Sequence, residues 1–66
     1  MKYNASEVLC YGEYLTDEEF NYGGMFVRVR TVLLDGELYY VSMVNGEIKN
    51  FKKLKNNTWQ QVESDI

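Results

Sequence analysis

The chain has 66 residues, a formal charge of −3 and a single cysteine, Cys10. A chain of this length forms one domain and buries only about 60% of the surface that its unfolded state exposes, so it is marginally stable by itself. The lone cysteine excludes a disulfide within the monomer, and without a histidine a four-ligand zinc site is not expected. Aromatic residues make up 15% of the chain, which indicates an aromatic core that a homo-oligomer would enlarge.

The N-terminal segment, residues 1–24, is acidic, and its start supports two interpretations. One lysine against five carboxylates gives this segment a charge of −4, whereas the rest of the chain carries +1. Its β-branched and aromatic side chains favour a strand over Glu7–Leu15, which would cover one edge of a sheet. The alternative is a short helix over residues 5–12, with Asn4 as N-cap, Glu7 at N3 and Gly12 at its end.

The next stretch, Thr16-Asp17-Glu18-Glu19, has the pattern of a second capping box, with Thr16 as the cap. Acidic side chains in a first turn interact favourably with the helix dipole, so we expect one helical turn that ends at about Asn21. Gly23-Gly24 then predicts a flexible loop that leads into the next element.

Three runs rich in Val, Leu, Tyr and Phe fill residues 25–54, separated by Asp35-Gly36 and Asn45-Gly46. Asp-Gly and Asn-Gly are strong hairpin signals, because a two-residue type I′ turn needs a positive φ at both central residues. The three runs therefore predict a three-stranded antiparallel meander.

A short fourth strand is expected after a further turn at Asn56-Asn57. It would bring Trp59 near Leu54 and Val62 near Phe51. The predicted fold is all-β with at most one short helix or helical turn. Its meander would form a curled sheet, a small barrel, or half of a sandwich that a partner chain completes.

We expect the whole chain, residues 1–66, to form one small domain. Its parts would be an acidic strand-and-turn segment over 1–24, the meander over 25–62 and a frayed tail over 63–66.

The turn at Asp35-Gly36 determines the register of the first hairpin, with Leu34 opposite Glu37 and Val27 opposite Val44. Strand alternation then places one uncharged set of side chains on a common face, which we expect to be the core. This set is Val27, Val29, Thr31, Leu33, Leu38, Tyr40, Ser42 and Val44. Truncating Tyr40 in such a core would cost a few kcal/mol.

The opposite face of the predicted sheet mixes apolar and cationic side chains. It carries Phe26, Arg28, Arg30, Val32, Leu34, Tyr39, Val41 and Met43. If Asn45-Gly46 sets the next register, Ile48 lies opposite Met43 and Lys52 opposite Tyr39 on this same face. Phe51 would then join Tyr40 on the core face.

Enzymatic chemistry has few candidate residues in this chain. General acid–base catalysis most often uses histidine, which is absent, and Cys10 has no histidine to activate it. Gly23-Gly24 lacks the surrounding pattern of a phosphate-binding loop. We therefore expect a protein that is not an enzyme, with no catalytic residues, no metal site and no cofactor.

The first candidate binding site is cationic and aromatic, and consists of Arg28, Arg30, Tyr39 and Lys52. Arginine beside aromatic side chains suits a protein interface (a self-interface included), a bound phosphate or nucleotide, or stacked single-stranded nucleic acid. One hypothesis is a homo-oligomeric sponge in which these residues bind a phosphorylated nucleotide. The alternative is a solvent-facing sheet surface, with arginine stems lying over apolar neighbours.

The second candidate is an acidic, tyrosine-rich surface that would dock on a basic partner protein. Its residues are Tyr11, Glu13, Tyr14, Asp17, Glu18, Glu19 and Tyr22. The alternative role for these tyrosines is packing at the core and its rim.

Charge and hydropathy limit the partners. An acidic chain disfavours nucleic acid, and no run approaches the roughly 20 apolar residues of a membrane span or the apolar run of a signal peptide. We therefore expect a cytoplasmic protein. In size, composition and lack of catalytic residues it resembles the small, acidic, Tyr- and Asn-rich proteins that bacteriophages encode against host enzymes and defence systems.

That resemblance involves no motif and assigns no residue roles. It implies a viral protein in the host cytoplasm that inhibits or sequesters a host defence protein, and the acidic surface would do the docking. The nucleotide sponge is one alternative, and a structural or assembly module without a ligand is another.

Overall fold

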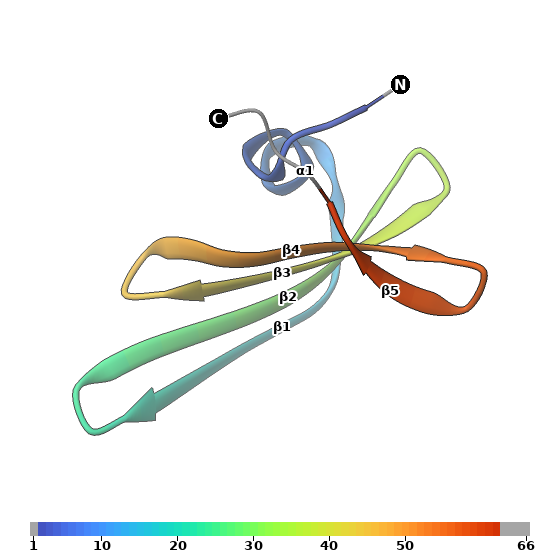
Figure 1. Ribbon diagram of the computed structural model, residues 1–66. Coiled ribbons are helices and arrows are strands. Elements are labelled where there is room, and N and C mark those ends of the chain that lie inside the picture. The colour runs from blue at the N-terminus through green and yellow to red at the C-terminus, as the bar shows by residue number, and fades with distance from the viewer. Residues whose placement is uncertain (1, 63–66) are drawn as a thin grey trace.

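The computed structural model describes residues 2–62, which form one antiparallel sheet and one short helix (Figure 1). The elements are α1 (Ala5–Tyr11), β1 (Glu13–Tyr22), β2 (Met25–Leu34), β3 (Glu37–Val44), β4 (Glu47–Lys55) and β5 (Thr58–Gln61). The strand order β1-β2-β3-β4-β5 makes every strand pair with its neighbour in the chain. The sheet is curled and not closed, which confirms the all-β curled sheet and not the small barrel. The expected fraying of residues 63–66 lies outside the described residues.

Four two-residue turns connect the five strands. Their residues are Gly23-Gly24, Asp35-Gly36, Asn45-Gly46 and Asn56-Asn57, and all eight have φ between 50° and 89°. Positive φ at both central positions is the condition for a type I′ turn, whose twist matches that of the flanking strands. Three of these turns were predicted. The prediction of a flexible loop at Gly23-Gly24 is wrong, because these two glycines form the tight turn of a hairpin.

Strand β1 replaces the helical turn that was expected to begin at Thr16. It pairs with β2 from Tyr22 opposite Met25 to Glu13 opposite Leu33, with one irregularity between Tyr14 and Thr16. A single helical turn carries the cost of helix nucleation for very few hydrogen bonds. Pairing with β2 along ten residues outweighs the local capping pattern, so the helical prediction is wrong.

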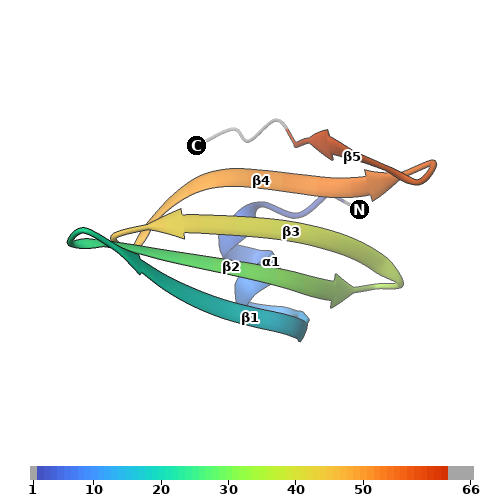
Figure 2. The same cartoon turned by 90° about the horizontal axis from the view of Figure 1, so that it is seen from below.

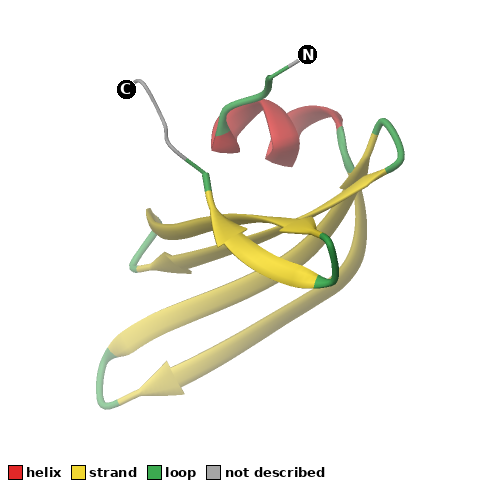
Figure 3. Ribbon diagram, turned by 45° about the vertical axis from the view of Figure 1, so that its right-hand side comes forward, coloured by secondary structure: helices red, strands yellow, loops and turns green. Residues whose placement is uncertain are grey.

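Helix α1 replaces most of the strand that was favoured over Glu7–Leu15, of which Glu13–Leu15 do lie in a strand, β1. The helix is the alternative left open at the sequence level. The Asn4 side-chain Oδ1 accepts from the Glu7 N–H (2.8 Å), and Glu7 Oε1 accepts from the Asn4 N–H (3.0 Å). A seven-residue helix is marginal alone. Helix α1 lies over one side of the sheet (Figure 3). Its residues Ala5 and Val8 are buried, and this packing supports the helix. Within residues 2–62, no helix is long and apolar enough to cross a membrane.

The core lies between α1 and the face of the sheet that we call the helix-side face. This face carries Phe26, Arg28, Arg30, Val32, Leu34, Tyr39, Val41, Met43 and Phe51. The buried apolar residues are Ala5, Val8, Val32, Tyr39, Val41 and Phe51. The prediction that the core lies on the face with Val27 and Tyr40 is therefore wrong, because α1 covers the helix-side face.

The predicted register of β2 with β3 is confirmed along its whole length, from Leu34 opposite Glu37 to Val27 opposite Val44. The predicted grouping of these side chains on two faces follows from that register. Tyr40 lies on the other face and is half-buried, so the truncation cost predicted for it belongs to Tyr39.

The register of β4 is predicted in part. Met43 lies opposite Ile48 as expected, but an irregularity between Ser42 and Met43 shifts the rest of the strand. Phe51 consequently pairs with Val41, not beside Tyr40, and Lys52 pairs with Tyr40 instead of Tyr39. An extra residue in one strand moves every later side chain to the other face. The prediction that Phe51 shares a face with Tyr40 is therefore wrong. The prediction that Lys52 shares a face with Arg28 and Arg30 is also wrong.

Strand β5 confirms the predicted end of the meander. Leu54 lies opposite Trp59, and the Val62 N–H donates to the Phe51 carbonyl oxygen (2.9 Å). The side of the sheet away from α1, which we call the open face, is the one seen in Figure 2, with α1 behind it. It carries Phe20, Val27, Val29, Thr31, Leu33, Leu38, Tyr40, Ser42, Val44, Lys52, Leu54 and Trp59.

Candidate functional site: the β1–β2 arm

The end of the β1–β2 hairpin projects beyond the neighbouring strands, and we call residues 17–28 the β1–β2 arm (Figure 1). Met25 and Phe26 pair with β1 only, since pairing of β2 with β3 begins at Val27. The Phe26 N–H donates to Asn45 Oδ1 (2.9 Å), and the Asn45 N–H donates to the Phe26 carbonyl oxygen (2.8 Å). These two bonds attach the base of the tip to the β3–β4 turn.

The arm is exposed on both faces. All ten residues of β1 are exposed, and the tip adds large apolar side chains that water reaches. The exposed fractions are 39% for Phe20, 61% for Tyr22, 48% for Met25 and 55% for Phe26. Phe20 and Tyr22 stack with their ring centroids 6.0 Å apart. Clustered exposed aromatic side chains are typical of interaction surfaces.

A charge cluster occupies the helix-side face of the arm, because β1 pairing places Asp17 opposite Arg30 and Glu19 opposite Arg28. Arg28 donates through Nε to Asp17 Oδ1 (2.9 Å) and through Nη2 to Oδ2 (3.0 Å). Arg30 Nε also donates to Asp17 Oδ1 (3.2 Å). Arg28 Nη1 lies 3.6 Å from Glu19 Oε2. The two guanidinium charges are thus matched by two carboxylates.

Tyr14 connects this cluster to the helix. The Arg30 Cζ lies 4.5 Å from the centroid of the Tyr14 ring, a cation–π distance. The Tyr14 hydroxyl donates to the Leu9 carbonyl oxygen (2.6 Å), one of the carbonyls that the end of α1 leaves without a helical partner. The arm is therefore tied to both the sheet and the helix.

Hydrogen bonds from Arg28 are the main cause that lowers the pKa of Asp17, to about 2, with smaller contributions from Arg30 and an opposing effect of burial. A carboxyl whose pKa is lowered in the folded state stabilises the fold above its unfolded pKa of about 4. This contribution is lost as the pH falls toward 2. We expect the melting temperature to fall between pH 4 and pH 2, and by less in Asp17→Asn than in the wild type.

Glu47→Gln is the matched control for this pH series, since the Glu47 side chain is 73% exposed at the start of β4, opposite Val44. The control should keep the acid sensitivity of the wild type. Equal acid sensitivity in Asp17→Asn and the wild type would contradict a stabilising role for the Asp17 carboxylate.

A hollow of about 300 Å³ lies beside the charge cluster. Its lining residues are Glu19, Phe26, Arg28, Arg30, Met43 and Gly46. This volume is at the lower limit of small-molecule sites. The exposed ring of Phe26 and one carboxylate, that of Glu19, border the hollow together with the two arginines, so it offers a partner both a ring face and a hydrogen-bond acceptor.

The residues predicted to bind a nucleotide do not gather at one place. Arg28 and Arg30 are neighbours on the helix-side face, whereas Tyr39 is 3% exposed beneath α1 and Lys52 lies on the open face. The sequence-based interpretation missed Asp17 as the partner of both arginines. A two-residue turn at Gly23-Gly24, had residues 13–22 been interpreted as a strand, would have placed Asp17 opposite Arg30.

The residues predicted to dock on a partner lie almost entirely on β1. Tyr14, Asp17 and Glu19 share the helix-side face, and Glu13, Glu18 and Tyr22 share the open face. Tyr11 lies at the end of α1 and is 69% exposed. The exposed side chains of Phe20, Met25 and Phe26, which belong to the same surface, were not predicted.

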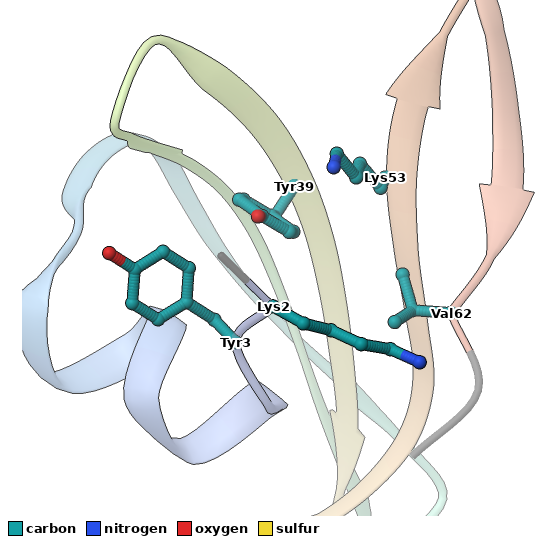
Figure 4. A pocket seen from close by; sticks show the side chains of 5 residues that line it. All are labelled: Lys2, Tyr3, Tyr39, Lys53 and Val62. Carbon is teal, nitrogen blue, oxygen red and sulfur yellow. The ribbon is translucent and has the colours of Figure 1, made fainter.

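A second hollow, of about 210 Å³, lies between the N-terminus of α1 and strands β3 and β4 (Figure 4). Lys2 extends across it toward Val62. The Lys53 Nζ lies 2.5 Å from Glu37 Oε2, and the Tyr3 hydroxyl donates to Asp35. The charge of Lys53 is thus already paired, and the volume is below that of ordinary ligand sites, so the β1–β2 arm is the stronger candidate.

Comparisons with known proteins identify no family for this chain. No protein-family model matches it, and neither the curated proteins nor the solved structures that were searched give a match.

Proposed function

We propose that this chain is a non-enzymatic binding protein that inhibits or sequesters a partner protein by docking its β1–β2 arm on a basic surface. The observation that carries the proposal is the pair of exposed side chains Phe26 and Glu19 on the helix-side face of the arm, next to a strand β1 whose ten residues are all exposed. Buried aromatic anchors contribute most of the energy of many protein interfaces, and carboxylates around them select and steer a basic partner.

The helix-side face of the arm has both components. Phe26 is 55% exposed at the border of the hollow, and the Glu19 side chain is 61% exposed beside it. The bonds from Arg28 and Arg30 to Asp17 hold β1 against β2, so less conformational entropy is lost when a partner binds. The resemblance to phage-encoded inhibitors makes a host enzyme or defence protein the expected target, in the cytoplasm of the host.

The same contacts weaken the case for the nucleotide sponge. A phosphate that approaches Arg28 and Arg30 would have to displace Asp17 from three hydrogen bonds and would meet Glu19. Tyr39 and Lys52 would add nothing to that site from where they lie. A structural module without a ligand would leave the exposed Phe26 and Glu19 on the helix-side face without a role.

Affinity capture from a bacterial lysate tests the proposal with paired variants. We expect the double variant Glu19→Lys with Phe26→Ala to lose the protein that the wild type retains, with a loss of binding of at least 10-fold, because charge and aromatic anchor are removed together. The matched control is Thr58→Lys with Gln60→Lys, which changes the net charge by the same amount on exposed positions of β5.

Equal capture by the arm variant and the β5 control would contradict docking through the arm. The sponge is tested separately by native mass spectrometry of the gently purified protein. A retained mass of nucleotide size that disappears in Arg28→Ala with Arg30→Ala would favour the sponge and contradict the proposal.

A further inference from the structure

The open face of the sheet has a large apolar region, with polar Thr31, Ser42 and Asn50 near its centre. Half-buried Val27, Val29, Leu33, Leu38, Tyr40, Val44 and Leu54 form a stripe across β2, β3 and β4, and exposed Phe20 and Trp59 extend it at either side. Among residues 2–62, the one helix lies on the other side of the sheet (Figure 2). An antiparallel sheet with two apolar faces needs a second layer on each of them.

The core on the helix side is small for a chain of this length. Among residues 2–62 it contains six buried apolar residues, of which Ala5 and Val8 come from α1, and half-buried side chains such as Leu9 and Met43 pack against them. Domains shorter than about 70–80 residues rarely obtain sufficient stability from such a core without a further staple. Cys10 is the only cysteine and is exposed, so the staple that remains within this sequence is association.

The area of the open face fits a second copy of the chain. The exposed fractions of Phe20, Tyr22, Met25 and Trp59 correspond to about 400 Å² at roughly 200 Å² for each large side chain. The half-buried stripe adds an area of the same order. A standard protein interface buries about 800 Å² on each partner, so this face is large enough for a stable dimer.

Charges at the two edges of the open face favour one orientation. Glu13 and Glu18 lie on this face in β1, whereas Lys52 lies on it in β4, where its Nζ is 5.8 Å from the centroid of the Tyr40 ring. Glu47, also on this face in β4, is paired with Lys49 (3.3 Å). A two-fold axis parallel to the strands places β1 of one copy over β4 and β5 of the other. An axis across the strands would place the carboxylates of the two β1 strands together.

We propose that two copies of this chain pack through their open faces as a sandwich, with the two-fold axis parallel to the strands. Sheets in such sandwiches lie about 10 Å apart and keep their strand directions within about 30° of each other. The interface is isologous, so Glu18 of each copy lies against the strand of the other copy that carries Lys52. The pairing of Glu18 with Lys52 therefore occurs twice. Glu19 and Phe26, on the helix-side face, stay accessible to a different protein.

Sedimentation velocity with a matched pair of threonine variants tests the dimer. The wild type should sediment with twice the monomer mass of 7.8 kDa at micromolar concentration. Thr31→Lys, at the centre of the open face, should raise the dissociation constant at least 100-fold and sediment as a monomer. Thr58→Lys, on an exposed position of β5 opposite Lys55, should remain a dimer.

Trp59 gives an independent readout because it is the only tryptophan and lies on the open face, 6.0 Å from the Tyr40 ring. Its fluorescence maximum should shift to shorter wavelength as the wild-type dimer forms on raising the concentration. The maximum in Thr31→Lys should stay at the long-wavelength position. A wild type that is monomeric at every concentration, or a Thr31→Lys that remains a dimer, would overturn the proposal.

If Thr31→Lys does not fold, exchanging the charges of Glu18 and Lys52 tests the dimer instead. Glu18→Lys alone and Lys52→Glu alone should each weaken the dimer about 10-fold, because each places like charges across the interface. The double variant should recover the wild-type dissociation constant. A double variant as weak as the single variants would overturn the proposed orientation and with it the proposal.

Discussion

Replacing Tyr39 with alanine is expected to lower the free energy of unfolding by about 3–5 kcal/mol. The Tyr39 side chain is 3% exposed beneath α1, and its ring stacks on that of Phe51 with centroids 5.7 Å apart and an angle of 17° between the ring planes. Truncation removes this contact and leaves a cavity at the centre of the core. A loss of that size approaches the total stability of a small domain, so the variant should be largely unfolded without denaturant.

Urea unfolding monitored by circular dichroism measures this effect, with all proteins at one concentration because association adds to the apparent stability. Tyr11→Ala is the matched control, since Tyr11 is 69% exposed at the end of α1 and its loss should change the unfolding free energy by no more than about 0.5 kcal/mol. Equal stability of the two variants would show that α1 does not cover Tyr39.

Replacing Gly12 with alanine is expected to cost about 1–3 kcal/mol, although any residue can adopt its backbone conformation of φ −81° and ψ 166°. The cause is space. A Cβ at this position would lie 2.1 Å from Val32 Cγ1 and 2.7 Å from the Val8 carbonyl oxygen. Gly12 therefore allows the chain to leave α1 close against β2 and to continue directly into β1.

A double-mutant cycle with Val32→Ala tests that cause. Removing Cγ1 of Val32 takes away the nearest obstacle, so Gly12→Ala should cost less in the Val32→Ala background than in the wild type, and the two effects should be non-additive. The rescue should be partial because the contact with the Val8 carbonyl remains. Strictly additive effects would contradict the close approach of Gly12 to Val32.

Turn chemistry explains which parts of the fold were predictable. Asp35-Gly36 and Asn45-Gly46 specify hairpins locally, and a two-residue turn then determines the register of β2 with β3 without further information. The choice of core face depends on where α1 packs. That packing is a tertiary contact of Ala5 and Val8, so strand alternation alone could not reveal it.

The candidate site was predictable in part for related reasons. The two arginines were identified as unusual because their charges interrupt an apolar sheet surface. Their partner Asp17 was missed because the capping pattern at Thr16 favoured a helical turn, and pairing with β2 overrode that local preference. Lys52 was placed on the wrong face because the irregularity after Ser42 has no local sequence signal.

The helix-side face of the arm and the open face of the sheet would bind different partners. The helix-side face of the arm, with Phe26 and Glu19, would contact another protein, and the open face, with Trp59, would contact a second copy of this chain. The two surfaces therefore predict different products when a reactive group is placed on each.

Photocrosslinking in bacterial cells, with p-benzoylphenylalanine at single positions, tests this account most directly. The probe at Phe26 should yield an adduct with a different protein, and the probe at Trp59 should yield an adduct of twice the monomer mass of 7.8 kDa. A probe at Gln60, an exposed residue of β5 on the helix-side face, should yield neither adduct. Self-adducts alone from Phe26, or no adduct from it, would contradict the account of this chain as a binding protein that docks through its β1–β2 arm.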